Sequence, residues 1–236
     1  MIENENLPLL DQLQTPTAVK KDKRLFRCWK RFFDVVFCTL FIILFCWLYG
    51  LLALSIKIED PEGPALFKQK RLGRDGRIFD FYKFRSMHVN SEHTGSGVYS
   101  DDEDPRITKV GNFLRKSSLD ELPQLFNIIK GDMSLIGPRP PLTYHPWPIE
   151  DYSDFQRRMF EVRPGITGWA QINGRKDVEW NHRIELNVWY VDNMSFLLDM
   201  KIFFTTFAKV FGNADNQNKG ATVTTTTNAS SEKRVS

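Results

Sequence analysis

The sequence predicts a helix-rich α+β protein that is held in a membrane by one N-terminal helix. Three observations predict this class: an apolar run over 32–56, an alternation of apolar and polar residues over 65–87, and an apolar stripe at helical spacing over 118–130. The chain has 236 residues, 42% of them hydrophobic, so it can form one packed domain with appendages.

The apolar run, from Phe32 to Ile56, reads FFDVVFCTLFIILFCWLYGLLALSI and is long enough to cross a hydrocarbon core of roughly 30 Å. It exceeds the ~7–15 residue core of a cleaved signal peptide and lacks a small-residue cleavage site. The alternative is a buried helix of a soluble domain, which so uniform a run disfavours. Asp34 is expected at the membrane interface or beside an Arg or Lys.

Basic residues flank the run on both sides, which bears on its topology. They are Lys20, Lys21, Lys23, Arg24, Arg27, Lys30 and Arg31 before it, and Lys57, Lys68, Lys70 and Arg71 after it. Because basic flanks stay on the cytoplasmic side, we expect a re-entrant helix whose two ends return to one face.

The chain divides by composition into four parts. We expect a flexible basic leader over 1–24, the membrane helix over 25–57, a cytoplasmic-face domain that carries the chemistry over 58–211, and a disordered tail over 212–236.

Arg-Asp-Gly at 74–76 is the expected turn of a β-hairpin. The acidic cluster at 101–104 lies in an expected loop over 88–105, as solvated surface or, alternatively, as metal ligands.

Several classes of function are disfavoured. A formal charge of +3 does not indicate nucleic-acid binding. Cys28, Cys38 and Cys46 show neither metal-ligand spacing nor a second cluster with which to pair, so a disulfide framework is not expected. Zinc hydrolase chemistry is unsupported because the four histidines lack ligand spacing; they are His88, His93, His145 and His182.

Asp120 and Glu121 are the first candidates for chemistry. Ser118 stands three residues before Glu121 in the form of a capping box, which places both carboxylates in the first turn of a helix. There the helix dipole favours the ionised form, as a nucleophile or metal ligand requires. The alternative is ordinary capping by acidic residues. Pro123 would break a helix beyond its first turn, which favours a start one or two residues later than the box implies.

Cationic and glycine-rich segments accompany this pair. Arg139 stands between two prolines in GDMSLIGPRPPL, which suits phosphate binding or a plain proline-rich loop. RPGITGWAQINGR at 163–175 suits a loop around an anionic ligand, with Arg163 or Arg175 meeting its oxygens. With Lys83 and Arg85, these residues are consistent with phosphoryl chemistry, in which cations offset developing charge.

The segments KRFFD, GPALFKQKRLG, FDFYKFRSM, RITKVGNFLRKSSLDELPQLFNIIKGDMSLIGPRP, RPGITGWAQINGR and YVDNMSFLLDMKIFFTT occur in that order between Lys30 and Phe211. They resemble the bacterial sugar transferase family of polyprenyl-phosphate phosphoglycosyl transferases. The resemblance implies that a UDP-sugar gives its sugar 1-phosphate to undecaprenyl phosphate and that UMP is released.

The resemblance also implies roles for residues. Asp120 is the implied nucleophile of a covalent phosphosugar intermediate, with Mg²⁺ beside it, and Glu121 assists by positioning groups or accepting a proton. Arg115 and Arg139 are candidates for the phosphates, and Arg175 for the nucleotide.

The chain resembles the small form of the family, which implies a monotopic enzyme at the bacterial inner membrane, facing the cytoplasm, with one re-entrant helix and amphipathic interfacial helices. The segment WAQINGR is similar to the corresponding segment of enzymes that handle acetamido sugars of the diacetamidobacillosamine type. Expected partners are the UDP-sugar, undecaprenyl phosphate, membrane lipid, and downstream glycosyltransferases or a second copy. Nucleic acid is not expected.

One feature departs from the small form, which commonly breaks its membrane helix at a Ser-Pro pair. Here the corresponding residues are Cys46 and Trp47, so we expect the bend near Gly50. Two other functions stay open: a non-catalytic membrane adaptor for glycan assembly, and a glycosyltransferase that moves only the sugar and releases UDP.

Overall fold

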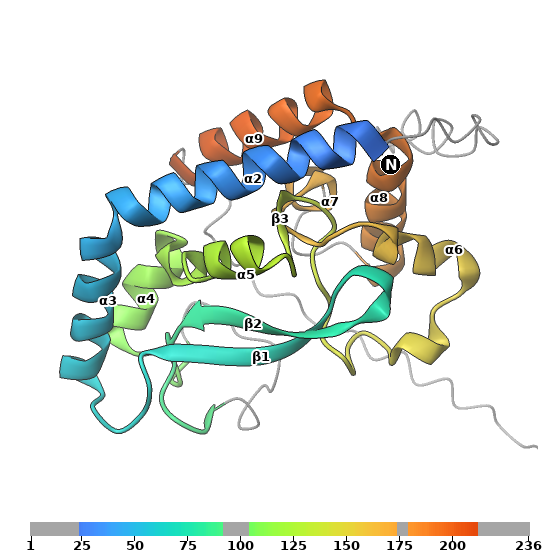
Figure 1. The fold of residues 1–236 in the computed structure, drawn as a ribbon. Helices are drawn as coiled ribbons and strands as arrows, with labels where there is room; N and C mark the ends of the chain where they lie inside the picture. The colour runs from blue at the N-terminus through green and yellow to red at the C-terminus, as the bar shows by residue number, and fades with distance from the viewer. Residues whose placement is uncertain (1–23, 92–103, 174–178, 212–236) are drawn as a thin grey trace, which may run out of the picture.

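The computed structural model describes residues 24–91, 104–173 and 179–211 (Figure 1). The tail, the leader up to residue 23, Arg175 and residues 101–103 of the acidic cluster lie outside these ranges. The described part is rich in helices and has two small sheets, which confirms the predicted α+β class.

The apolar run forms two helices, α2 (Arg24–Leu44) and α3 (Cys46–Glu59), which meet at Phe45 with a bend of 65° (Figure 1). The bend predicted near Gly50 is therefore wrong, because Gly50 lies inside α3. Within the described residues, no single helix is long and apolar enough to cross a bilayer, whereas this bent pair meets that test together.

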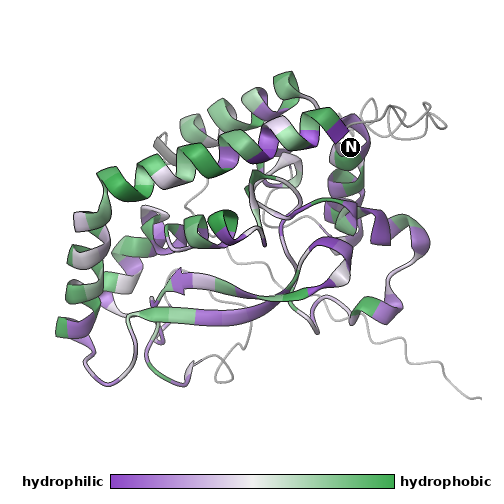
Figure 2. Cartoon of the chain, viewed as in Figure 1, coloured by the Kyte–Doolittle hydropathy of each residue, from purple (hydrophilic) through white to green (hydrophobic). Residues whose placement is uncertain are grey.

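The two faces of α2 differ. Asp34 and Cys38 are buried against the rest of the protein, and Asp34 Oδ2 accepts a hydrogen bond of 2.5 Å from Ser134 Oγ. The opposite face exposes large apolar side chains, and Figure 2 shows α2, α3 and α9 (Phe196–Phe211) as largely hydrophobic. These exposed side chains of α2 are Leu25, Trp29, Phe32, Phe33, Val36, Phe37, Leu40, Ile43 and Leu44.

The predicted hairpin is confirmed. β1 (Leu66–Leu72) pairs antiparallel with β2 (Ile78–Phe84), from Leu66 opposite Phe84 to Leu72 opposite Ile78. The turn η1 (Arg74–Gly76) places Asp75 and Gly76 in the left-handed region, at φ of 56° and 73°. Glycine and aspartate tolerate that conformation better than most residues, which explains why this tripeptide turns.

α4 (Lys109–Lys116) is fixed at its N-terminus by two neighbours. Thr108 Oγ1 accepts from the Gly111 N–H at 2.9 Å, and the Glu59 carboxylate at the end of α3 accepts from the N–H groups of Lys109 and Val110 at 2.7 and 2.8 Å. A Cβ at Gly111 would lie 2.0 Å from the carbonyl oxygen of Ser86, so the helix can approach the end of β2 only because this residue is glycine.

The chain then forms η3 (Leu119–Glu121) and α5 (Gln124–Lys130), which ends at Gly131 with φ of 99°. The remaining elements of the described chain are β3 (Ser134–Ile136), η4 (Ile149–Asp151), α6 (Asp154–Arg157), η5 (Arg158–Glu161), β4 (Gly165–Thr167), α7 (Trp169–Asn173), α8 (Trp180–Asn193) and α9. β3 and β4 pair in parallel.

The elements form layers, with α2 and α9 side by side above α5 and the hairpin (Figure 1). Lys30 Nζ lies 2.6 Å from Asp199 Oδ2, which joins α2 to α9. Below α2, a buried cluster joins it to the hairpin and α5; its members are Cys38, Phe79, Phe81, Leu125, Ile128 and Met133. Burial of this apolar surface is the main stabilisation of the layers.

Asn127 on α5 fixes the position of the hairpin. Its side chain is fully buried, and its Nδ2 donates to the Asp80 carbonyl at 2.7 Å while its Oδ1 accepts from the Tyr82 N–H at 3.0 Å. Two bonds from one amide to one strand set the register of β2 on α5, because a shift along the strand would break both.

We expect Asn127→Ala to lower the free energy of unfolding by about 2–4 kcal/mol, since it leaves the N–H of Tyr82 and the carbonyl of Asp80 without their partner inside the protein. Denaturation of the full chain in mild detergent, followed by circular dichroism, measures this loss. Asn193→Ala is the control, because its exposed amide donates to the Trp189 carbonyl of its own helix and its loss should stay within about 0.5 kcal/mol. Equal losses in the two variants would contradict the role given to Asn127.

Candidate active site

Asp120 and Glu121 lie in η3, a single turn between α4 and α5. The predicted capping box is wrong: Ser118 has φ of 57°, and its side chain makes no cap hydrogen bond. α5 begins only after Pro123, whose missing N–H is harmless at a helix start. The two carboxylates therefore belong to a tight turn rather than to the first turn of a regular helix.

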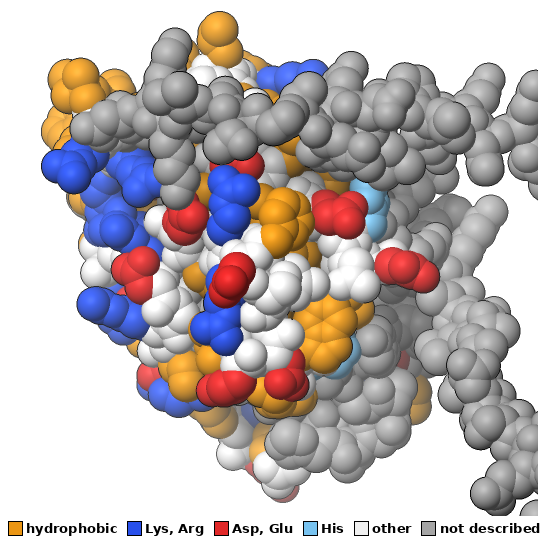
Figure 3. Space-filling model, turned by 90° about the vertical axis from the view of Figure 1, so that its right-hand side faces the viewer, with side chains coloured by type: hydrophobic (Ala, Val, Ile, Leu, Met, Phe, Trp, Pro, Cys, Tyr) orange, Lys and Arg blue, Asp and Glu red, His pale blue; other side chains and the backbone are white. Residues whose placement is uncertain are grey.

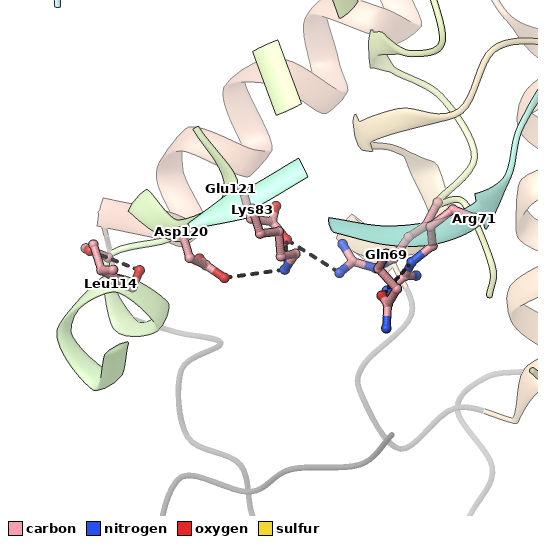
Figure 4. A network of polar contacts seen from close by, with 8 residues as sticks. Gln69, Arg71, Lys83, Leu114, Asp120 and Glu121 are labelled. Atoms are coloured by element: carbon pink, nitrogen blue, oxygen red, sulfur yellow. Dashed lines mark hydrogen bonds and ion pairs between the residues drawn. The ribbon is translucent and has the colours of Figure 1, made fainter. Parts of the chain in front are cut away.

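Lys83 of β2 holds both carboxylates (Figure 4). Its Nζ lies 3.0 Å from Glu121 Oε1 and 3.4 Å from Asp120 Oδ2. The Asp120 side chain is only 8% exposed, compared with 20% for Glu121 and 22% for Lys83. One cation thus serves two adjacent anions in a partly enclosed place, where charge interactions are stronger than in water.

Arg139 approaches Glu121 from the other side. Its Nη2 lies 3.5 Å from Glu121 Oε1, and its side chain is 46% exposed. The loop that carries it is tied to β1: Arg71 Nη1 donates to the Pro140 carbonyl at 2.7 Å, and the Leu72 N–H donates to the Pro141 carbonyl at 3.0 Å. The exposed guanidinium has donors left for an anion that enters from solvent.

The two carboxyl groups differ in acidity. Burial raises the pKa of Asp120; the Lys83 charge opposes this and the Glu121 charge adds to it. Burial also acts to raise the pKa of Glu121, but Lys83 and Arg139 together outweigh it and lower that pKa to about 2. Glu121 therefore stays ionised, while the pKa of Asp120 is raised, and such a difference between neighbouring acidic groups is common at functional sites.

The structure brings four of the predicted site residues together: Lys83, Asp120, Glu121 and Arg139. Arg115, on α4, is close enough for its charge to lower the pKa of Asp120. Arg85 points elsewhere: it is buried, its Nη2 donates to the Asp60 carbonyl and lies 3.8 Å from Asp60 Oδ1. Arg175 lies outside the described residues. The roles given to these residues in binding stay predictions.

The glycine-rich segment at 163–175 is not a loop over 165–173, where it forms β4 and α7. A Cβ at Gly165 would lie 2.1 Å from the Gly137 backbone nitrogen, and one at Gly168 would lie 2.1 Å from the Gly137 carbonyl oxygen. These glycines allow two backbones to approach each other. Trp169 stacks on Trp189, with ring centroids 4.6 Å apart.

Sequence reasoning missed two residues that build the site, Asn127 and Arg71. Both act through backbone carbonyls or amides of distant segments, Arg71 on the loop of Arg139 and Asn127 on β2 next to Lys83. The signal that could have found Asn127 is a polar residue among the apolar positions of α5.

The donor set suits a magnesium ion that arrives with a substrate. Among the described residues, no group of three or more His, Cys, Asp or Glu side chains converges as a metal cage would require. Mg²⁺, however, is usually held by one or two carboxylates together with substrate phosphates. Asp120, the predicted metal ligand, is such a carboxylate.

The family model described as bacterial sugar transferase matches residues 25–213. The chain belongs to this family. The match includes the bent helix pair, the hairpin and the whole Asp120–Glu121 site, so family membership and the geometry concern the same part of the chain.

Three relatives illustrate the similarity. The chain is 48% identical over 187 residues to an uncharacterised sugar transferase, EpsL, of Bacillus subtilis, which covers 77% of this chain and 86% of the relative. It is 41% identical to an undecaprenyl-phosphate galactose phosphotransferase of Salmonella typhimurium, covering 80% of this chain and 41% of the relative. It is 38% identical to a UDP-glucose:undecaprenyl-phosphate glucose-1-phosphate transferase of Escherichia coli, covering 89% of this chain and 45% of the relative. The chain thus spans less than half the length of the latter two.

Proposed function

We propose that this protein transfers a sugar 1-phosphate from a UDP-sugar to undecaprenyl phosphate and releases UMP. The observation that carries the proposal is the cluster of Lys83, Asp120, Glu121 and Arg139, which lies in a chain of the bacterial sugar transferase family. The names of the Salmonella and Escherichia relatives, which specify undecaprenyl phosphate and a transferred phosphosugar, support it.

In the first step, an Asp120 carboxylate oxygen attacks the phosphorus that bears the sugar. A P–O bond forms to Asp120, the bond to the bridging oxygen of the diphosphate breaks, and UMP leaves with that oxygen. In the second step, a phosphate oxygen of undecaprenyl phosphate attacks the same phosphorus, and Asp120 leaves as a carboxylate. One diphosphate is exchanged for another through an acyl phosphate, so no outside energy source is needed.

The neighbouring side chains supply charge and position. Lys83 and Arg139 offset the negative charge that develops on phosphoryl oxygens, and both hold Glu121 ionised. Glu121 keeps Lys83 beside Asp120, a positioning role that matches its 3.0 Å contact. A bound Mg²⁺ would be held by Asp120 and the diphosphate and would further offset phosphate charge.

The way in which the enzyme is inserted in the membrane is also part of the proposal. The bent α2–α3 pair and its basic flanks support a re-entrant, monotopic insertion with the site on the cytoplasmic face of the bacterial inner membrane. The exposed apolar faces of α2 and α9 support interfacial contact. The proposed donor carries an N-acetylated amino sugar, because the segment WAQINGR resembles that of enzymes for acetamido sugars. The names of the two relatives given above specify galactose and glucose instead.

The nucleotide that is released tests the reaction. With undecaprenyl phosphate, Mg²⁺ and a panel of UDP-sugars that includes acetamido sugars, glucose and galactose, we expect UMP and a lipid diphosphate sugar. Release of UDP would instead identify transfer of the sugar alone, and no turnover with any donor would favour a non-catalytic adaptor.

Asp120→Asn should lower the rate by at least about a thousandfold, because the amide cannot act as the nucleophile. Glu121→Gln should lower it severely but leave measurable turnover.

The pH dependence tests the charge arrangement. Asp120 must be ionised to attack, and its pKa is raised, so kcat/KM should fall as the pH drops through that raised value. Because the Lys83 charge lowers the pKa of Asp120, Lys83→Met should move this acid limb to higher pH. Arg139→Met, which removes a cation that contacts Glu121, should lower the rate with a smaller displacement of the limb. A limb at the same pH in wild type and Lys83→Met would contradict the assignment.

The topology is tested by cysteine labelling. If the helix pair is re-entrant, single cysteines placed at residue 10 and at exposed Lys68 should both react with a membrane-impermeant maleimide only after the cells are opened, in a background in which Cys28, Cys38 and Cys46 are replaced by serine. Labelling of the residue-10 position alone in intact cells would show that the pair spans the bilayer.

A further inference from the structure

A cavity separate from the Asp120 site lies under the N-terminal half of α2, at the end where Figure 1 places α8. Its volume is about 50 Å³, roughly the room of four water positions, which suits a phosphate group and not a nucleotide or a sugar. Its walls come from α2, the hairpin turn, β3, the segment around Arg163 and α8. It shares no residue with the Asp120 site.

Basic side chains dominate the walls. Five of them line the cavity, against two carboxylates: Arg27, Lys30, Arg31, Arg74 and Arg163 against Asp34 and Glu161. Both carboxylates are engaged, Asp34 by the Ser134 hydroxyl at 2.5 Å and Glu161 by Arg158 at 3.8 Å. Two of the cations also have carboxylate partners outside the lining, Lys30 with Asp199 at 2.6 Å and Arg74 with Asp75 at 3.3 Å. The lining itself carries more positive than negative charge.

The hydrogen bonds of these cations leave donors unused. Arg31 and Arg163 bind main-chain oxygens at the end of α5, through Nη2 to the Ile129 carbonyl at 3.0 Å and through Nε to the Gly131 carbonyl at 2.8 Å. Within the described chain, the buried Nε of Arg27 has no hydrogen-bond partner. Arg31 also donates through Nη1 to the Ile128 carbonyl. A guanidinium has five N–H donors, so one or two carbonyl contacts leave at least three of them for a further acceptor.

The cations also repel one another. Burial lowers the pKa of the Arg163 guanidinium, and the neighbouring charges of Arg31 and Arg74 lower it further. An anion placed among these three residues would relieve that repulsion and accept charge-assisted hydrogen bonds from them.

We propose that this cavity binds a phosphate group separate from the reacting ones, and that the phosphate is the headgroup of an anionic lipid. Apolar side chains that surround the start of α2 favour a lipid: Leu25 is 73% exposed, Trp29 55% and Phe32 56%. Tryptophan beside basic residues is typical of the headgroup level of a bilayer. Figure 3, which views this end of the molecule, shows basic side chains gathered along one edge of the surface.

Binding of lipid or phosphate to the full chain tests this site. The protein, in a neutral detergent, is titrated with dioctanoyl phosphatidylglycerol, with dioctanoyl phosphatidylcholine, and with inorganic phosphate, and the apparent affinity is taken from the shift in thermal unfolding. We expect phosphatidylglycerol to stabilise the wild type more than phosphatidylcholine does. Arg27→Gln and Arg74→Gln should each weaken its affinity about fivefold, the effect of one basic group at an anionic surface.

Arg77→Gln is the matched control, since Arg77 is an exposed arginine next to the same hairpin turn but does not line the cavity. It should bind like the wild type, and so should Asp120→Asn, which separates this site from turnover. If inorganic phosphate alone stabilises the protein and Arg27→Gln abolishes that effect, the site stands but its ligand is a free anion. Equal affinities in wild type and Arg27→Gln for both ligands, or an equal loss in Arg77→Gln, would overturn the proposal.

Discussion

The buried amide of Asn127 is the contact on which the arrangement of the site depends. It binds the backbone of β2 on both sides of Phe81, and Lys83 follows two residues later on the same strand. Asn127 belongs to the helix that directly follows Asp120 and Glu121. One side chain thus sets the distance between the cation and the two carboxylates, which come from segments 37 and 38 residues away from Lys83 along the chain.

Given that arrangement, the adjacent carboxyl groups need not behave alike. Both are largely withdrawn from water, but Lys83 and Arg139 converge on Glu121, while burial dominates at Asp120. The cations therefore stabilise the charge of Glu121 most, and its charge in turn raises the basicity of its neighbour. Two adjacent acidic residues thus differ, with a raised pKa at Asp120 and a lowered one at Glu121, and this difference comes from contacts with segments distant in the sequence.

The features that were predicted correctly from the sequence depend on local chemistry. Those that were missed depend on contacts between backbone segments that are distant in the sequence. The Arg-Asp-Gly turn follows from the conformational freedom of its residues, and the hairpin from its alternation. The prediction of a capping box was wrong because Ser118 adopts a left-handed conformation between two packed helices. The glycines at 165 and 168 resembled a ligand loop, but their purpose is contact with Gly137, which no local pattern encodes. The break between α2 and α3 at Phe45 is likewise not marked by an adjacent proline or glycine in the sequence.

The helix α2, which carries half of the apolar run, also helps to build the interior. α2 buries Asp34 against Ser134, Cys38 in the central core and Arg31 on the end of α5, while its other face exposes aromatic and aliphatic side chains. A helix in this position cannot leave the protein to cross a bilayer without exposing a carboxylate and opening the core, and both changes are costly. The contacts of Asp34 and Arg31 therefore favour an α2 that lies against the globular part. After the bend at Phe45, α3 also packs on this part, with Leu52 and Ile56 buried against Phe84 and Leu114. The polar residues of the apolar run therefore fix α2 to the same globular part that carries Asp120.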